Sequence, residues 1–137
     1  MGTVVFNIDP QLGQTSYPVI SLAICDLRLV DDTRWPWTLL IPRIPHMVEM
    51  IDISPELRSQ VWLEIDHISR VMRDQFSPSK LNVAWLGNQV RQLHIHIIAR
   101  YQDDEAWPNP VWGVGNAKPY DTAELNARLS ILRTSLK

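Results

Sequence analysis

The sequence predicts an α+β fold: a mostly antiparallel sheet of about five strands, one long helix packed on that sheet, and a second helix at the C-terminus. Three observations lead to this prediction. Apolar residues recur at helical spacing over 57–76, several short β-prone runs are bounded by proline, glycine or aspartate, and a helix-start pattern appears at residue 121. A length of 137 residues suits one domain, which we expect over 1–137.

The first third of the chain predicts a short helix followed by a β-hairpin. Asp9 suits the N-cap of a helix and Pro10 suits its first position. A strand ends at Pro42, because proline cannot donate a hydrogen bond to a neighbouring strand. The expected elements are a strand or extended lead-in at 3–8, a strand at 19–29, a turn at 31–34 and a strand at 37–41. The last two strands form the hairpin.

The long helix begins after Ser54, a suitable N-cap, with Pro55 at its first position and the acidic Glu56 in its first turn. Apolar side chains then follow at spacings of four and three, which predicts one buried stripe. They are Leu57, Val61, Ile65, Ile68, Met72 and Phe76. Beyond this helix the pattern predicts a strand at 81–86, a tight turn at 87–88, a strand at 90–100, and a capped helix from 121 to 136.

The composition of the chain argues against several classes of function. With 45% hydrophobic residues, 20% charged residues and a net charge of −2, the chain lacks the basic surface that binding to nucleic acid or an anionic membrane requires. One cysteine, Cys25, excludes an internal disulfide and is expected to be a buried strand thiol. No apolar run approaches the roughly 20 residues of a membrane span. The N-terminal pattern does not resemble a secretory signal, so we expect a cytoplasmic protein.

The segment from Gln92 to Arg100 is the most informative for function. Residues two apart on a β-strand point to the same face, so Gln92, His94 and His96 are expected to share one side, opposite buried aliphatic residues. That face carries two imidazoles and an amide, all able to donate and accept hydrogen bonds near neutral pH. This arrangement favours chemistry over simple solvation.

A histidine on such a strand suits nucleophilic attack on phosphorus. An imidazole whose Nδ1–H is held by a backbone carbonyl presents a free Nε2 lone pair, which can form a phosphoramidate that water then cleaves. The attacked phosphate also needs hydrogen-bond donors. Gly87, Asn88 and Gln89 directly precede the strand and offer backbone N–H groups and two side-chain amides.

Two other interpretations of the histidine pair remain open. Same-face histidines on a strand are often structural or surface residues. They also bind metal ions, but a metal site needs further ligands. Candidates for a third ligand are His46, His67, Asp26 and the acidic run 103–105, although His67 also fits a helix residue at the edge of the packing stripe.

The residues Gln92-Leu93-His94-Ile95-His96-Ile97-Ile98 resemble the histidine triad motif, in which histidines alternate with apolar residues. The likeness includes the strand end at 39–43, the long helix and the strand before the histidines, and it is strongest over 22–112. The stretch 107–113, rich in tryptophan and proline, is similar to a branch found mostly in bacteria.

This resemblance implies a nucleotide hydrolase or nucleotidyl transferase. Such enzymes act at the α-phosphate of phosphoramidates, adenylates or dinucleoside polyphosphates through a nucleotidyl-histidine intermediate, and they need no cofactor. His94 would be the nucleophile and His96 would support the phosphate. The implied nucleotide-binding residues are Asn88 and Gln89 at the phosphate, Asp26 at the ribose, and Leu22, Ile24 and Leu40 at the base, with ordinary core packing as the alternative for these three.

The main departure from the motif is Gln92, which stands where the family has its first histidine. An amide at this catalytic position would tune the hydrogen bonds around the nucleophile. A non-catalytic nucleotide sensor therefore remains an alternative. The family's usual homodimer is a further expectation, with Trp62 on the long helix as the candidate interface residue and with Trp107 and Trp112 closing over the site or reaching the partner.

Overall fold

The computed structural model describes residues 5–137, and within them the chain forms one five-stranded sheet in the order β1-β2-β3-β5-β4. All neighbouring strands are antiparallel. This confirms the expected α+β fold. The elements are α1 (Pro10–Gln14), β1 (Ser16–Ser21), β2 (Cys25–Val30), β3 (Trp37–Pro42), a 3₁₀ turn η1 (Met50–Asp52), α2 (Pro55–Phe76), β4 (Lys80–Ala84), β5 (Ile95–Arg100) and α3 (Thr122–Ser135).

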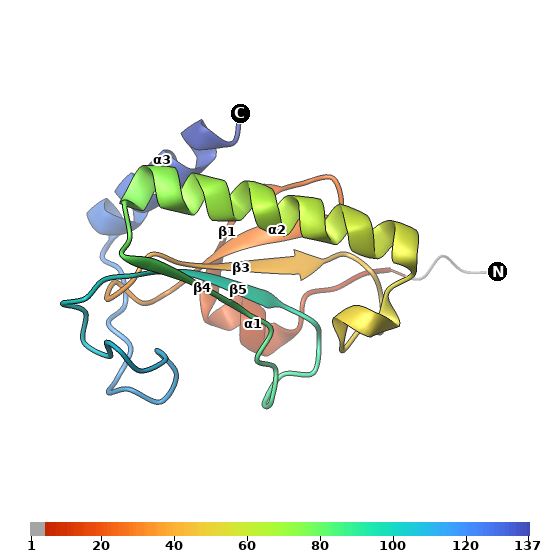
Figure 1. Ribbon diagram of the computed structural model, residues 1–137, viewed down its shortest axis with the longest axis horizontal. Coiled ribbons are helices and arrows are strands. Elements are labelled where there is room, and N and C mark those ends of the chain that lie inside the picture. The colour runs from red at the N-terminus through yellow and green to blue at the C-terminus, as the bar shows by residue number, and fades with distance from the viewer. Residues whose placement is uncertain (1–4) are drawn as a thin grey trace.

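The two faces of the sheet are covered by different parts of the chain. Helices α2 and α3 lie on one face, whereas α1 and the loop after β5 lie toward the other (Figure 1). The main hydrophobic core forms between the sheet and α2, and it includes Leu40, Ile95 and Ile97 from the central strands. Because side chains alternate along a strand, the residues between these positions face the second side, where the histidines lie.

Helix α2 follows its sequence signals closely. Ser54 is the N-cap, Pro55 opens the helix, and Ser77 ends it in the left-handed conformation with φ of 45°. The predicted stripe is confirmed at its centre, since Val61, Ile65, Ile68 and Met72 are buried; Phe76 is half-buried and Leu57, in the first turn, is exposed. Burying one such side chain contributes about 1.5–3 kcal/mol, so this stripe fixes the helix on the sheet.

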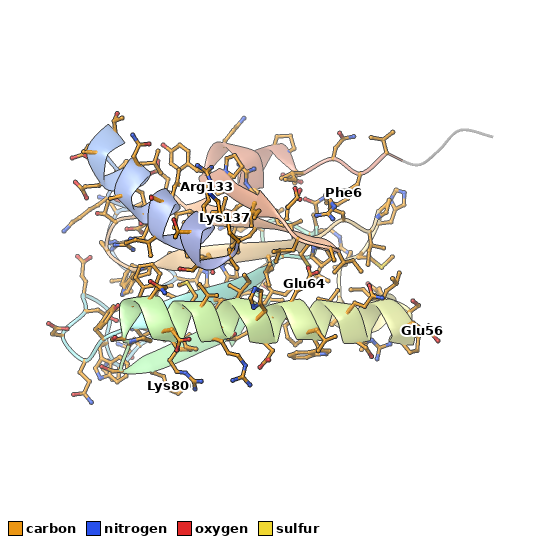
Figure 2. The ribbon with its side chains drawn as sticks, turned by 90° about the horizontal axis from the view of Figure 1, so that it is seen from above. Phe6, Glu56, Glu64, Lys80, Arg133 and Lys137 are labelled. Carbon is orange, nitrogen blue, oxygen red and sulfur yellow. The ribbon has the colours of Figure 1, made fainter. Side chains whose placement is uncertain are left out.

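The single strand expected over 19–29 is wrong, because the chain turns back within it. β1 and β2 are two antiparallel strands joined by residues 22–24. The turn contains no glycine, proline or asparagine, but Glu64 of α2 accepts hydrogen bonds from the backbone N–H groups of Ile24 and Cys25 at 3.0 and 2.8 Å (Figure 2). A side chain that is distant in the sequence therefore stabilises this turn. Cys25 is buried, as expected.

The histidine strand begins later than predicted. β5 starts at Ile95, and residues 90–94 approach it as a loop. The backbone N–H of Leu93 donates to the carbonyl oxygen of Met47, at 3.0 Å, rather than to a neighbouring strand. β4 covers 80–84 and so ends before the predicted 86.

The remaining local predictions agree with the structure. Asp9 accepts a hydrogen bond from the backbone of Gln11 and caps α1. The β2–β3 hairpin is present, and Asp121 caps α3 through the backbone N–H of Glu124. Residues 5–8 form an extended lead-in, while residues 3 and 4 of that predicted segment lie outside the described residues. No helix in the described part of the chain is long and apolar enough to cross a membrane.

Candidate functional site

A cleft of about 440 Å³ opens on the face of the sheet opposite α2, and both histidines of the motif line it. Its apolar wall consists of Leu12, Val30, Leu39, Leu86 and Val90, and its polar and aromatic lining consists of Thr15, Trp37, Asn88, Gln89, His94, His96 and Trp112. Among the described residues, none that lines the cleft is an aspartate, glutamate, lysine or arginine. Apolar surface with a few hydrogen-bonding groups is typical of a site for a small organic ligand.

His94 is held in the form that a nucleophile requires. It precedes β5, is 5% exposed, and its Nδ1 lies 2.7 Å from the backbone oxygen of Gln92. A carbonyl oxygen only accepts hydrogen bonds, so Nδ1 carries the proton and Nε2 keeps its lone pair. The structure thus contains the backbone contact that the sequence argument required.

His96 is held in a different way. It is 6% exposed, and its Nδ1 accepts a hydrogen bond from the indole Nε1–H of Trp37 at 3.0 Å. The pKa of His96 is lowered to about 4, chiefly by burial and also by the nearby His94, while the backbone of Leu86 acts in the opposite direction. The Nε2 atom of His96 is buried and has no hydrogen-bond partner among the described residues. Its ring centroid lies 5.0 Å from those of His94 and Trp112.

The Gln92 side chain does not join the histidines, so its predicted part in their hydrogen-bond network is corrected. Its Oε1 accepts from the backbone N–H of Asp9, and its Nε2 donates to the carbonyl oxygen of Asn7, both at 2.8 Å. Gln92 lies outside the strand and borders a separate cavity, which it shares with His46 and Arg91. Only its backbone oxygen contacts His94.

The predicted phosphate contacts Asn88 and Gln89 are both brought to the cleft. Both are exposed and line the cleft. Gly87 precedes them in a tightly packed turn, where a Cβ atom would lie 2.8 Å from the carbonyl oxygen of Val90 and 3.6 Å from Cε1 of His94. Any larger residue at position 87 would therefore displace this loop.

The predicted ribose and base contacts are not brought to the cleft. Asp26 pairs with Arg43 at 2.8 Å and accepts a hydrogen bond from Ser21, and it borders a different hollow. Leu22, Ile24 and Leu40 pack in the core on the α2 side of the sheet, which corrects the base-pocket prediction in favour of its core alternative.

Other residues form the cleft instead. Trp37 and Leu39 alternate on β3, and Leu39 pairs with His96 across the ladder, so strand alternation alone could have identified them. Leu12 and Thr15 come from α1 and its C-terminal end, and Trp112 comes from the loop after β5. No pattern in the sequence indicates that these two distant segments meet the histidines.

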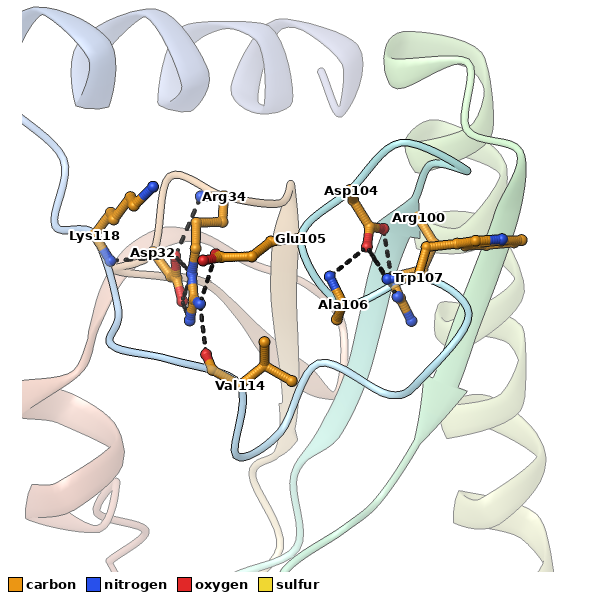
Figure 3. A network of polar contacts seen from close by, with 9 residues as sticks. All are labelled: Asp32, Arg34, Arg100, Asp104, Glu105, Ala106, Trp107, Val114 and Lys118. Atoms are coloured by element: carbon orange, nitrogen blue, oxygen red, sulfur yellow. Dashed lines mark hydrogen bonds and ion pairs between the residues drawn. The ribbon is translucent and has the colours of Figure 1, made fainter.

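The loop over 101–120 is fixed on the sheet by two charge networks, each centred on a buried arginine (Figure 3). In the first, Arg34 pairs with Asp32 at 2.8 Å and with Glu105 at 2.9 Å, and it donates to the backbone oxygen of Val114. Asp32 also accepts from the backbone N–H of Lys118. Because Val114 is two residues from Trp112, this network helps to place the Trp112 side chain at the cleft.

The second network is centred on Arg100, which is 1% exposed. It pairs with Asp104 at 2.8 Å and donates to Asn82 and to the backbone oxygen of Asn109. Burial alone would raise the pKa of Asp104, but hydrogen bonds from Arg100 and from backbone N–H groups, including that of Ala106, lower it overall. The arginine thereby ties β4, β5 and the loop together.

A metal centre has little support in this geometry. Among residues 5–137 there is no group of three histidine, cysteine, aspartate or glutamate side chains placed to hold an ion. Of the proposed third ligands, His67 is exposed on α2 and His46 borders the separate cavity. Asp104 and Glu105 belong to the two arginine networks.

Comparison with known proteins assigns this fold and cleft to one class, the HIT domain, whose match covers residues 16–103. The chain therefore belongs to the histidine triad family. Membership supports nucleotide binding and hydrolase or transferase activity in general.

Individual relatives agree with this assignment. A histidine triad protein from Bradyrhizobium japonicum is 36% identical, with a TM-score of 0.95 over 98% of this chain and 100% of that one. One from Marinobacter aquaeolei is 34% identical, with a TM-score of 0.94 over 97% of both chains. The curated "Protein hit" of Bacillus subtilis is 29% identical over 100 aligned positions, and the match covers 68% of this chain and 68% of that one.

Proposed function

We propose that the protein is a nucleotide hydrolase or nucleotidyl transferase in which His94 attacks the α-phosphate of a purine nucleotide. The substrate would be a phosphoramidate, an adenylate or a dinucleoside polyphosphate. One observation carries this proposal: the Nδ1–H of His94 donates to the Gln92 carbonyl oxygen, which leaves Nε2 as a nucleophile in a ligand-sized cleft.

The reaction would proceed in two steps. In the first, the Nε2 lone pair forms a bond to the α-phosphorus, and the bond to the leaving group breaks with its electron pair going to that group, which takes a proton from solvent. The positive charge on the substituted imidazole is stabilised by the Gln92 carbonyl oxygen at Nδ1. In the second step, water or another acceptor attacks the phosphorus, gives up a proton, and the bonding pair returns to Nε2.

The cleft lining supports binding of such a substrate. The amides of Asn88 and Gln89 supply donors for phosphate oxygens, and no carboxylate in the described lining repels them. Leu12, Val30 and Leu39 form an apolar wall that suits a planar base.

A second candidate is a nucleotide sensor that binds without turnover. The observation that favours it is the lack, among the described lining residues, of any carboxylic acid or lysine that would protonate a leaving group. A substrate with a poor leaving group would then bind and react negligibly.

The deciding experiment compares three proteins. Wild type, His94→Ala and His67→Ala are assayed with an adenosine phosphoramidate and with diadenosine polyphosphate, and rapidly quenched samples are searched by mass spectrometry for a nucleotidyl adduct. We expect turnover and an adduct in wild type and in His67→Ala, since His67 is exposed on α2 away from the cleft. We expect neither in His94→Ala.

Two outcomes would count against the enzyme. Equal turnover in wild type and His94→Ala would exclude His94 as the nucleophile. Calorimetric binding of AMP without any adduct or turnover in wild type would instead identify the sensor.

We also propose that the active form is a homodimer. β4 is an outer strand of the sheet, and Val83, Trp85 and Trp62 of α2 are exposed beside it. The rings of Trp62 and Trp85 contact edge to face, with centroids 6.0 Å apart. A second copy that paired its own β4 here would extend the sheet and cover these side chains.

A further inference from the structure

We infer that Trp37 is a positioning residue that fixes His96 as a neutral Nε2–H donor at the cleft, so that the two neighbouring imidazoles are held in opposite tautomers. The catalytic consequence rests on the proposed function. The tautomers themselves follow from hydrogen bonds within the protein.

The Trp37 indole determines which ring nitrogen of His96 carries the proton. An indole N–H is a donor only, so the Trp37 Nε1–H can bond to Nδ1 at 3.0 Å only if Nδ1 carries no proton. A neutral imidazole has one N–H, and it must then be on Nε2. His94 has the reverse arrangement, because its Nδ1 faces a carbonyl oxygen.

The surroundings of His96 also disfavour a positive charge on its ring. A proton added to His96 would go to Nδ1, where it would meet the Trp37 N–H and break that hydrogen bond. The ring is also enclosed by aromatic side chains, with the centroid of Trp37 at 5.8 Å and that of Trp112 at 5.0 Å, and its ionisable neighbour in the described structure is His94. Burial in this aromatic setting lowers the pKa of His96, in agreement with a neutral ring.

The Nε2–H of His96 is available to a bound ligand. Nε2 is buried and makes no hydrogen bond of ordinary length with the described residues, the backbone of Leu86 being its nearest polar neighbour, and the ring lines the same cleft as His94. A buried donor without a partner is costly unless a ligand or water satisfies it. One ring thus offers a lone pair for attack, while the other offers an N–H for a phosphate or leaving-group oxygen.

Two variants separate the hydrogen bond from aromatic packing. Trp37→Phe keeps an aromatic ring but removes the N–H, and Trp112→Phe is the matched control because Trp112 contacts the His96 ring edge to face without donating to it. Ligand-free protein with ¹⁵N-labelled histidine is examined by long-range ¹H–¹⁵N NMR, which reports the protonated nitrogen of each ring. In wild type and Trp112→Phe we expect His96 to be Nε2–H and His94 to be Nδ1–H.

In Trp37→Phe we expect mixed tautomers for His96 and a titration midpoint raised toward the ordinary value of about 6.5. Loss of one buried hydrogen bond at the site should lower kcat of Trp37→Phe about tenfold, with a smaller change in KM.

The wild-type spectrum decides the tautomer even if Trp37→Phe does not fold. An Nδ1–H signal for His96 in wild type would overturn the inference, as would a His96 titration in Trp37→Phe equal to that in Trp112→Phe. The spectrum requires neither substrate nor turnover. Failure of the His94→Ala experiment would therefore refute the proposed function and leave the tautomer assignment intact.

Discussion

At the scale of single residues, the partner of each imidazole sets its chemistry. His94 and His96 belong to one short segment and are almost equally buried. A carbonyl oxygen next to Nδ1 makes the first a potential nucleophile, whereas an indole N–H next to Nδ1 makes the second a donor. Two identical side chains thus acquire different chemistry because their hydrogen-bond partners differ, although these partners do not themselves react.

The low pKa of His96 predicts a loss of stability in mild acid. The folded pKa is about 4, below the ordinary value of about 6.5, so between these values the unfolded chain binds a proton at this position that the folded chain does not. The contribution of neutral His96 to the free energy of unfolding is therefore complete above pH 6.5 and is lost as the pH falls toward 4. We expect His96→Phe to reduce the fall in unfolding free energy between pH 7 and 4.5 by about 2 kcal/mol.

Urea unfolding at several pH values checks this prediction. The comparison uses the slope with pH rather than absolute stability, since the substitution also alters packing. His67→Phe is the control, because His67 is exposed and should keep the wild-type slope. A His96→Phe slope equal to that of wild type would contradict the assigned pKa.

The sequence predicted the two histidines of the cleft better than it predicted the residues around them. His94 and His96 could be recognised because alternation on a strand and the triad pattern both depend on local spacing. Gln92 and Asp26 could not be placed, because their partners, the backbone of residues 7–9 and Arg43, come from other segments. The position of a hydrogen-bonding side chain depends on which partner the tertiary structure brings within reach.

At the scale of elements, the loop after β5 depends on the Arg100–Asp104 pair. Both side chains are almost fully buried. Asp104→Asn would leave the buried guanidinium without its counterion, and breaking a buried pair from one side costs about 3–5 kcal/mol. We expect a decrease of about 3 kcal/mol in unfolding free energy, measured by urea denaturation at pH 7.

Asp66→Asn provides a matched control for this prediction. Asp66 pairs with Arg70 on α2, but both side chains are more than half exposed. Exposed pairs contribute little, so the control should lose less than about 0.5 kcal/mol. Equal losses in the two variants would show that burial does not govern the Arg100 pair.

Elements with strong local signals were the easiest to predict. Helix α2 has an N-cap, a proline at its first position and a regular apolar stripe, all of which act within the segment itself. The β1–β2 turn has none of these, and its backbone N–H groups depend on Glu64, about 40 residues away. β5 starts later than predicted for a similar reason, because the backbone N–H of Leu93 donates to Met47, which lies far away in the sequence.

At the scale of the whole molecule, the proposed homodimer depends on the exposed apolar surface at β4. Trp85 is 37% exposed and Trp62 is 46% exposed. A lysine at position 85 would place a charge in the centre of the interface, which is costly once the surface is covered. We expect Trp85→Lys to be monomeric by sedimentation at concentrations where wild type is dimeric.

Ile131→Lys tests whether any added surface charge has this effect. Ile131 is 39% exposed on α3, away from β4, so this variant should sediment as wild type does. Monomeric wild-type protein would refute the dimer, and dimeric Trp85→Lys would place the interface elsewhere.

The boundaries of the family match have a consequence for how such proteins diverge. The matched segment, 16–103, contains His94 and His96, but Leu12 and Trp112 of the cleft lining fall on either side of it. If the cleft accepts a nucleotide as proposed, its reacting groups and part of its walls, including Leu12 and Trp112, occupy separate stretches of chain. Exchanging only the segments before residue 16 and after residue 103 between relatives should then transfer substrate preference, while His94 and His96 stay unchanged.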